Sequence, residues 1–298
     1  MQVLSPALRY LLEVAATGSI TEASASLRVA ASSISRQITR LEQQAGVPLF
    51  ERHPGGMRPS PAGRLLIEAA RRCRAEEERA EAAIAGLTDA ARTTVRLAAS
   101  EGFAAGLLPQ VMARFRRAHP RTRFEVHVVE PATATELVRE GTADVALTFS
   151  LAPQRDVEVL HSEVLPVSAV VADDHPLARR DALWLADLQP HPLALRRSPS
   201  TLRQLFDIAC SLQQLSFEVA VSSDNPWLLL DVTRHGRLVT LAGRYSVTGP
   251  HATGLRLVPL RDEVLQQRVV QVQALAGRHP EPVVEEFVEL LVGVLARE

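Results

Sequence analysis

Hydroxyl and guanidinium side chains gather on one face of a predicted helix near the N-terminus. They belong to Ser32, Ser33, Ser35, Arg36 and Arg40. An apolar stripe of Ile34, Ile38 and Leu41 lies on the opposite face. Serine and arginine donate to phosphates and to base edges, and a helix with one apolar face can pack on a core while it enters the major groove. This face predicts DNA binding; a solvated surface of a generic three-helix bundle is the alternative.

A second group of polar side chains follows the predicted strands of the later part of the chain. Its members are Ser100, Glu101, Thr148, Arg196, Ser198, Ser200 and Thr201. In open α/β sheets, ligands bind beyond the carboxyl ends of the strands, where these residues fall. Ser198 is predicted to cap a helix with Pro199 at its first position, so that free N–H groups beside Arg196 attract a carboxylate or phosphate. An ordinary cap on a solvated loop is the alternative.

Short helices with clear start signals position the DNA-binding face. Leucines at helical spacing predict a first helix over 5–16. Ser19 and Glu22 form a capping pattern that opens a second helix. A third helix is expected over 31–44, and it carries the serines and arginines.

The N-terminal segment is basic although the whole chain is not. Residues 1–64 hold seven arginines and four glutamates, a net charge of +3, whereas the formal charge of the chain is −1. Arg52 opens a loop rich in proline and glycine, over 52–59, that is expected to contact the DNA backbone or minor groove as a wing. A basic N-terminal unit on an acidic remainder fits a local DNA footprint.

Many residues between positions 18 and 63 fall into one pattern of fixed spacing. They are Gly18-Ser19-Ile20, Ala23, Leu27, Ser35-Arg36-Gln37-Ile38, Leu41-Glu42, Gly46, Leu49-Phe50, Arg52 and Ala62-Gly63. This pattern resembles that of the LysR-type transcriptional regulators. The resemblance implies a winged helix-turn-helix in which Ser35, Arg36 and the wing arginine touch DNA. Two departures are present: Ala30-Ala31-Ser32 stands where the family often has Ser-Gln-Pro, and Pro59-Ser60 stands where it has Leu-Thr.

A long helix is expected over 61–88, because Ser60 and Pro61 form a start signal and no later proline interrupts it. Apolar residues recur along it at steps of three, four or seven: Leu66, Ala69, Cys73, Ala80, Ile84 and Leu87. Such a seam indicates pairing with a second copy. The resemblance likewise implies a dimerisation helix and favours a homotetramer. A helix folded back on its own body is the alternative.

Strands and helices alternate from residue 93 onward, which predicts parallel α/β sheets. Crossings near 163–166 and 263–268 divide this region into two lobes with a cleft and a hinge. The order of elements, together with Leu107-Leu108-Pro109 and Asp144-Val145-Ala146, resembles the effector domain of LysR-type regulators, which is akin to periplasmic solute-binding proteins.

The predicted fold class is α/β overall, with an N-terminal winged helix-turn-helix, a long linker helix and a C-terminal two-lobed effector domain like a periplasmic binding protein. The expected domains are 3–60 for DNA binding, 61–88 for dimerisation and 93–298 for effector binding. Within the last, lobe I is expected over about 93–163 and 267–298, and lobe II over about 164–266.

Signatures of catalysis are missing from the sequence. No G-x-S-x-G elbow, phosphate-binding loop, HExxH or dinucleotide fingerprint occurs, and the nine histidines are dispersed. We therefore expect no catalytic residue, no metal and no cofactor. Cys73 and Cys210 lack CxxC spacing, and no signal peptide or long apolar stretch is present. These features indicate a cytoplasmic protein with free thiols and no membrane partner.

The predicted function is that of a LysR-type regulator of promoter DNA, modulated by a small molecule in the cleft, with an anionic carboxylate as the candidate. Expected partners are double-stranded promoter DNA, further copies of the chain and, as a candidate, RNA polymerase. Two alternatives stay open: a cytoplasmic solute-sensing module that acts through protein partners, and an enzyme on the same two-lobed fold. The first would need exposed aromatics in the N-terminal unit, and the second a nucleophile with a paired base.

Overall fold

The computed structural model describes residues 4–53, 56–88, 93–104, 106–151, 154–197, 200–278 and 280–296. Contacts divide the chain into two compact units. The first holds residues 1–92 with 139–142, and the second holds 93–138 with 143–298. Each unit has an apolar core of its own.

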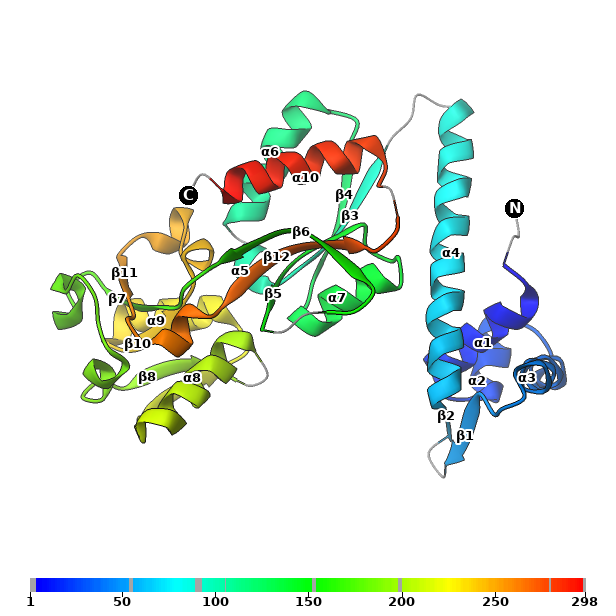
Figure 1. Ribbon diagram of the computed structural model, residues 1–298, viewed down its shortest axis with the longest axis horizontal. Coiled ribbons are helices and arrows are strands. Elements are labelled where there is room, and N and C mark those ends of the chain that lie inside the picture. The colour runs from blue at the N-terminus through cyan, green and yellow to red at the C-terminus, as the bar shows by residue number, and fades with distance from the viewer. Residues whose placement is uncertain are drawn as a thin grey trace. The chain divides into compact units, whose positions relative to one another are not determined.

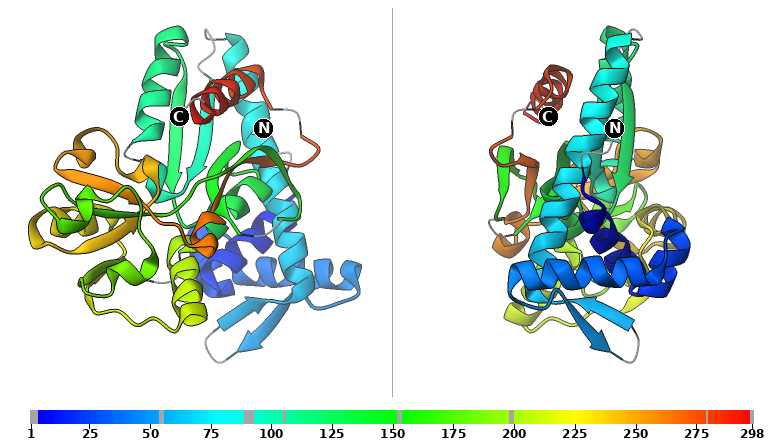
Figure 2. Two further views of the ribbon diagram at one scale, coloured as in Figure 1. Left: turned by 60° about the vertical axis from the view of Figure 1, so that its left-hand side comes forward. Right: turned by 90° about the vertical axis from the view of Figure 1, so that its right-hand side faces the viewer.

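Short helices, a hairpin and one long helix build the N-terminal unit. The elements are α1 (Pro6–Thr17), α2 (Ile20–Leu27), α3 (Ala31–Ala45), β1 (Phe50–His53), β2 (Gly56–Pro59) and α4 (Pro61–Thr88). Ile34 and Ile38 of α3 are buried in one cluster with Leu11 and Val14 of α1. The hairpin projects beyond the short helices (Figure 2). This is a winged helix-turn-helix followed by a long helix.

Local signals explain where the short helices begin and end. Ser19 Oγ accepts a hydrogen bond from the N–H of Glu22 at 3.4 Å and caps α2. The α1 helix ends at Gly18, whose φ of 70° lies in the left-handed region that glycine adopts without strain. Arg28 ends α2 in the same region, with a φ of 55°. These caps fix the tight turns on both sides of α2.

The start of α4 is held against the hairpin. Ser60 Oγ accepts from the N–H of Gly63 at 3.0 Å and donates to the carbonyl of Pro48 at 2.7 Å. Gly63 lies so close to Leu49 that a Cβ at position 63 would overlap the Leu49 carbonyl oxygen. The predicted start signal is confirmed, and the close approach explains why glycine occupies this position.

The second unit contains, in the part of the chain that the structure describes, two five-stranded sheets (Figure 1). The first has the order β4-β3-β5-β12-β6, with β3 (Thr94–Ala99), β4 (Arg123–Val128), β5 (Val145–Ser150), β6 (Val157–Val164) and β12 (Val269–Leu275). Its helices are α5 (Glu101–Ala104), α6 (Leu107–Ala118), α7 (Pro131–Arg139) and α10 (Pro282–Leu295). Leu97 and Leu147 are buried with α6 and α10, whereas Ala98 and Ala146 are buried with α7. The helices therefore cover both faces of the sheet.

The second sheet has the order β11-β7-β10-β8-β9. Its strands are β7 (Ser168–Ala172), β8 (Leu193–Arg196), β9 (Val219–Ser223), β10 (Val239–Ala242) and β11 (Leu255–Pro259). The helices are α8 (Thr201–Gln213) and α9 (Pro226–Gly236), with 3₁₀ turns η1 (Pro176–Arg179), η2 (Leu185–Leu188), η3 (Arg244–Ser246), η4 (Gly249–Ala252) and η5 (Glu263–Gln266). Leu205 of α8 is buried with Val171 of β7, and Leu230 of α9 with Val170. Successive residues of a strand point to opposite faces, so α8 and α9 cover opposite faces.

Two chain segments join the sheets. The chain passes from β6 to β7 over 165–167 and returns from β11 to β12 over 260–268. The N–H of Leu165 donates to the carbonyl of Arg268 at 2.7 Å, so the two segments lie side by side. Two adjacent connections of this kind form a hinge about which two lobes can rotate.

Candidate functional site

The α3 helix presents its serine and arginine side chains on an accessible face. Ser32, Arg36 and Arg40 are exposed, and Ser33 and Ser35 are half-buried. The opposite face is buried in the core of the N-terminal unit. The residues that were predicted on α3 to bind DNA therefore lie on or beside one surface.

Arg36 folds back toward the first turn of α3. Its Nε donates to the carbonyl oxygen of Ser32 at 3.2 Å. The cap position of this helix is Ala30, whose side chain makes no capping hydrogen bond. Uncapped N–H groups and a guanidinium thus lie at the N-terminal end of α3, the end whose residues contact bases when a recognition helix enters the major groove.

The β1–β2 hairpin forms the wing. Arg52 lies in β1 opposite Met57 of β2. The side chain of Arg52 lies outside the described residues, so its contact with DNA stays a prediction. The N–H of Met57 donates to the carbonyl of Gly18 at 2.7 Å, which ties the hairpin to the end of α1. The exposed Arg58 adds a positive charge to the wing.

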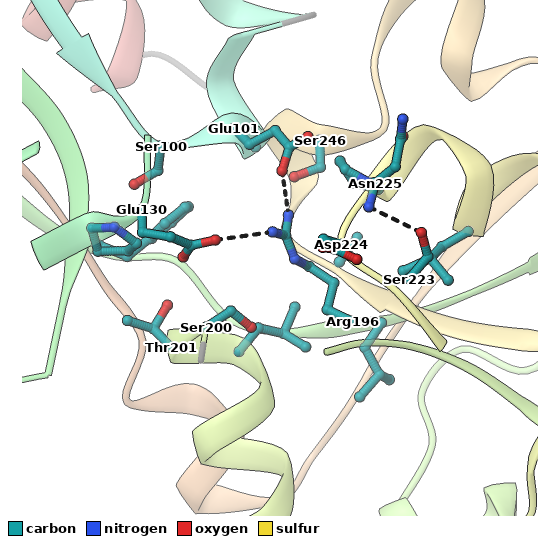
Figure 3. A pocket seen from close by; sticks show the side chains of 18 of the residues that line it. Ser100, Glu101, Glu130, Arg196, Ser200, Thr201, Ser223, Asp224, Asn225 and Ser246 are labelled. Carbon is teal, nitrogen blue, oxygen red and sulfur yellow. Dashed lines mark hydrogen bonds and ion pairs between the residues drawn. The ribbon is translucent and has the colours of Figure 1, made fainter. Parts of the chain in front are cut away.

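A cavity of about 590 Å³ lies between the two sheets of the second unit. Its polar lining residues are Ser100, Glu101, Glu130, Arg196, Ser200, Thr201, Ser223, Asp224, Asn225, Thr240, Ser246 and Arg268. The carboxyl ends of β3, β4, β8 and β9 open into it, and most of these side chains are labelled in Figure 3. Most of the residues that were predicted to bind a ligand line this cavity. Among those that the structure describes, the exception is Thr148.

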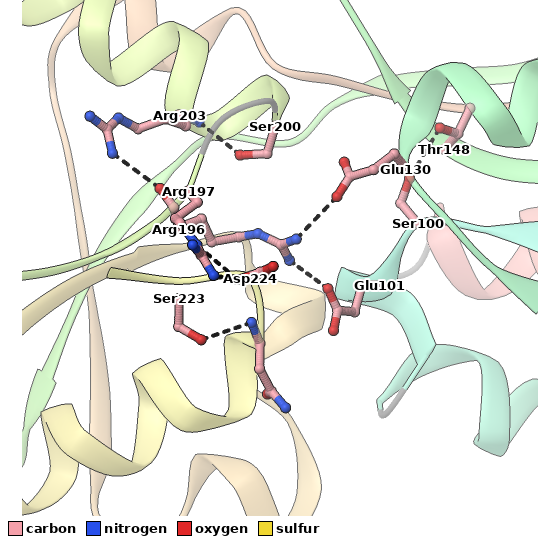
Figure 4. A network of polar contacts seen from close by, with 11 residues as sticks. Ser100, Glu101, Glu130, Thr148, Arg196, Arg197, Ser200, Arg203, Ser223 and Asp224 are labelled. Atoms are coloured by element: carbon pink, nitrogen blue, oxygen red, sulfur yellow. Dashed lines mark hydrogen bonds and ion pairs between the residues drawn. The ribbon is translucent and has the colours of Figure 1, made fainter. Parts of the chain in front are cut away.

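Arg196 reaches across the cavity from β8 to the first sheet. Its Nη1 lies 2.7 Å from Oε2 of Glu101, and its Nη2 lies 3.3 Å from Oε1 of Glu130 (Figure 4). Its side chain is 16% exposed, against 31% and 48% for the two glutamates, so the pairs are only partly screened by water. Arg196 Nε is buried without a hydrogen-bond partner among the described residues.

Thr148 lies behind the cavity wall. Its side chain is fully buried, and its hydroxyl lies 3.1 Å from that of Ser100, which does line the cavity. Thr148 therefore does not line the cavity but supports the Ser100 hydroxyl from within the lobe. Its predicted ligand contact stays a prediction. Ser100 follows the end of β3, whereas Thr148 lies within β5.

The helix that was predicted to begin at Pro199, with Ser198 as its cap, begins two residues later. The α8 helix begins at Thr201, and Ser200 Oγ caps it by accepting from the N–H of Arg203 at 3.2 Å. Ser198 and Pro199 lie outside the described residues. The serine that follows the proline thus takes the cap role, and its hydroxyl is partly engaged.

Arg197 turns away from the cavity that Arg196 enters. Its Nε donates to Oδ1 of Asp224 at 3.0 Å. This hydrogen bond from Arg197 lowers the pKa of the exposed Asp224 carboxyl. Since Arg197 does not line the cavity, it adds no direct contact for a ligand there.

Arg268 is one of the polar lining residues that sequence reasoning missed; the others are Glu130, Ser223, Asp224, Asn225, Thr240 and Ser246. Its side chain is stacked on Phe149, with Cζ 3.4 Å from the ring centroid, and its Nε donates to Thr201 Oγ1 at 3.4 Å. Only 7% of Arg268 is exposed, and its Nη1 has no hydrogen-bond partner among the described residues. Burial, with the nearby charge of Arg196, lowers the pKa of Arg268 to about 9, so the guanidinium stays charged at neutral pH. Its position was a signal that could have identified it: Arg268 is a charged residue directly before an apolar strand, where the chain crosses between the lobes.

The described residues offer no group of three or more His, Cys, Asp or Glu side chains that could hold a metal ion. Within the same ranges, no helix combines the length and apolar character that a membrane span requires.

Two family models match the chain. The model of the bacterial regulatory helix-turn-helix protein, lysR family, matches residues 6–64, and that of the LysR substrate binding domain matches residues 88–296. The HTH-type transcriptional regulator CysB of Burkholderia cenocepacia is 25% identical over 281 residues, covering 94% of this chain and 90% of the relative. A probable nitrogen assimilation transcriptional activator of Synechocystis sp. is 25% identical over 244 residues, covering 81% and 79%.

Solved structures share the fold. A variant of full-length OxyR from Pseudomonas aeruginosa has a TM-score of 0.64 at 18% identity, covering 100% of this chain and 95% of that chain. Full-length CbnR complexed with its target DNA has a TM-score of 0.62 at 18% identity, covering 96% and 98%. The predicted fold class is thereby confirmed. Because the family models match both units, this chain belongs to the LysR family of DNA-binding transcriptional regulators, with a substrate-binding domain over residues 88–296.

Proposed function

We propose that this regulator binds promoter DNA through α3 and the wing, and that a small molecule with an anionic group switches it by binding in the cavity between the two sheets. The observation that carries the proposal is the buried Arg268 guanidinium, which lines the cavity and lacks an anionic partner among the described residues. Buried charges in proteins are normally paired, so an unpaired one that faces a cavity favours a ligand of opposite charge.

Binding of such a ligand would favour closure of the two lobes. Arg268 belongs to the crossing segment and Arg196 to the second sheet, so an anion that accepts from both ties the lobes together more tightly than Glu101 and Glu130 do alone. A ligand shifts a conformational equilibrium only by its differential affinity for the two states, and a few kcal/mol is enough. Closure would then change how two paired DNA-binding units are spaced.

The regulator is proposed to act in the cytoplasm on double-stranded promoter DNA, with RNA polymerase as a candidate partner. No specific observation favours a module that acts through protein partners, or an enzyme on this fold. The test is a fluorescence anisotropy titration of the full chain against the DNA upstream of its own coding region, at two salt concentrations. Saturable, sequence-selective binding that weakens with salt is expected. Weak binding that is indifferent to sequence, with and without candidate ligands, would exclude the proposal.

Arg36→Ala is expected to weaken promoter binding about tenfold or more, because an arginine that contacts a base edge is worth roughly 1–3 kcal/mol. The side chain is exposed, so folding should be unaffected. The matched control is Arg114→Ala, since Arg114 is exposed on α6 of the second unit. Equal affinities of Arg36→Ala and the unaltered protein would remove Arg36 from the DNA contact.

Oxidation is expected to cross-link two copies of the chain through Cys73. Cys73 is exposed on α4 and lies close to the middle of that helix, so it would meet its counterpart in a parallel or a symmetric antiparallel pair. Burial raises the pKa of Cys210 to about 11, which keeps its thiol protonated and slow to react. A disulfide-linked dimer should appear on a non-reducing gel at low protein concentration.

Two variants control the cross-linking experiment. Cys210→Ser should give the same dimer as the unaltered protein, and Cys73→Ser should give none. If cross-linking survives in Cys73→Ser, or is absent from a protein that sediments as a dimer, Cys73 does not lie at the pairing seam of α4.

A further inference from the structure

The cavity has a basic end formed by the guanidinium of Arg268, which lines it. Only 7% of Arg268 is exposed, and it has no anionic partner among the residues that the structure describes. One face of the guanidinium is covered by Phe149, and its Nε is used by Thr201, so its terminal nitrogens are left for a ligand. A carboxylate accepts from such a charged donor in a short, strong hydrogen bond.

The same cavity has an acidic end with more negative than positive charge. Glu101 and Glu130, both from the first lobe, converge on the two terminal nitrogens of Arg196. This group of three side chains carries a formal charge of −1, and both glutamates stay partly exposed, at 31% and 48%. A plain anion that entered the cavity would add a negative charge beside them. A ligand that also carries a positive charge would instead neutralise the negative charge of these three side chains.

We propose that the ligand of the cavity is a zwitterion of the α-amino acid type. Its carboxylate accepts from the terminal nitrogens of Arg268, and its ammonium group lies against Glu101 and Glu130. This inference rests on the proposed ligand-controlled function, and it names the chemical class of the ligand. It assigns Arg268 as the residue that selects the carboxylate and the glutamate pair as the residues that select the amino group.

The rest of the wall accommodates the remainder of such a molecule. Leu229, Leu230 and Pro226 of α9 form an apolar part of the lining, beside the hydroxyls of Ser223 and Ser246. A cavity of about 590 Å³ is larger than the zwitterionic group alone needs, so the side chain of an amino acid fits with it.

The test uses thermal unfolding and calorimetry of the full-length protein with the standard α-amino acids at millimolar concentration. Each one that binds is compared with two analogues: the carboxylic acid that lacks the amino group and the amine that lacks the carboxylate. At least one amino acid should raise the unfolding midpoint. Both analogues should bind about tenfold more weakly or worse, because the amine leaves the buried Arg268 without an anion and the carboxylic acid adds a negative charge beside the glutamate pair.

Substitutions then separate the two ends of the site. Arg268→Met should reduce the affinity for the amino acid to that of the amine. Glu101→Gln combined with Glu130→Gln should weaken binding of the amino acid but not of the carboxylic acid, a pattern that general damage to the fold would not produce. Glu285→Gln, exposed on α10, is the matched control and should bind normally.

Two results would overturn the inference. Equal affinity for the amino acid and its carboxylic acid analogue would make the cavity a simple anion site. No binding by any amino acid in the set would reject the zwitterion class. The anisotropy titration with promoter DNA distinguishes these failures from failure of the proposed function, since selective DNA binding would persist in both cases.

Discussion

Gly63→Ala is expected to abolish promoter binding while the second unit stays folded. A methyl group at position 63 would overlap the carbonyl oxygen of Leu49, and backbone cannot move aside as a flexible side chain can. Overpacking of this kind costs roughly 3 kcal/mol or more. A unit of fewer than 100 residues has little stability to lose, so the start of α4 and the hairpin should separate. Anisotropy with promoter DNA measures the loss, and circular dichroism measures the remaining folded content.

Gly293→Ala is the matched control for this substitution. Gly293 lies within α10, and a Cβ there would meet nothing within 4 Å. Because alanine is the better helix former, the free energy of unfolding should rise by about 0.5–1 kcal/mol. If Gly63→Ala binds promoter DNA with unchanged affinity, α4 and the hairpin do not need the close packing described above.

Arg268→Met should stabilise the ligand-free protein. The buried guanidinium has lost most of its water and lacks an anionic partner among the described residues. Burying a charge in this way costs several kcal/mol, whereas its stacking on Phe149 returns no more than about 2 kcal/mol. A net gain of about 2 kcal/mol would raise the unfolding midpoint of this unit by roughly 5 °C. The same variant should no longer be stabilised by any ligand that binds through its carboxylate.

Arg196→Met should act in the opposite direction. Arg196 pairs with Glu101 and Glu130, and its removal would leave two carboxylates facing each other without a cation. A loss of roughly 1–2 kcal/mol is expected, because these pairs are partly exposed. Differential scanning fluorimetry compares the two variants. A lower midpoint for Arg268→Met than for the unaltered protein would show that the guanidinium is already satisfied.

The N-terminal unit was the most predictable part of the structure. Its short helices have local start and stop signals, such as Ser19 before α2 and Gly18 after α1, which act within one turn of the chain. The α4 helix begins at Pro61 as the sequence predicts, for the same reason. What the sequence could not supply is the direction of individual side chains, such as Arg36 turned back onto Ser32.

The sheets were less predictable at their edges. The pattern of alternating elements does not predict β6 or β11, each of which lies at one edge of its sheet. No residue of β6 is buried, so the strand contributes little to the core. A separate helical turn, α5, precedes α6, and its Phe103 is stacked on Phe149.

Prediction of all the cavity-lining residues would have required knowledge of contacts between residues that are distant in the sequence. Glu101, Arg196 and Thr201 follow strand ends and could be selected from that rule alone. Glu130 follows the end of β4 in the same way, but its role depends on its pairing with Arg196 across the lobes. The role of Arg268 depends on the hinge between the two crossing segments. Thr148 lies within β5, and the packing of the first lobe places it behind the wall.

The buried Arg268, which has no anionic partner among the described residues, also affects how long the protein survives in a cell. Proteases degrade the unfolded form, so the lifetime of a regulator follows its unfolded fraction. A ligand at a hundred times its dissociation constant stabilises the folded form by about 2.7 kcal/mol, which lowers the unfolded fraction about a hundredfold. A ligand that neutralises this guanidinium would therefore raise the number of regulator molecules as well as alter their affinity for the promoter. Scarcity of the ligand would then remove the regulator itself through turnover.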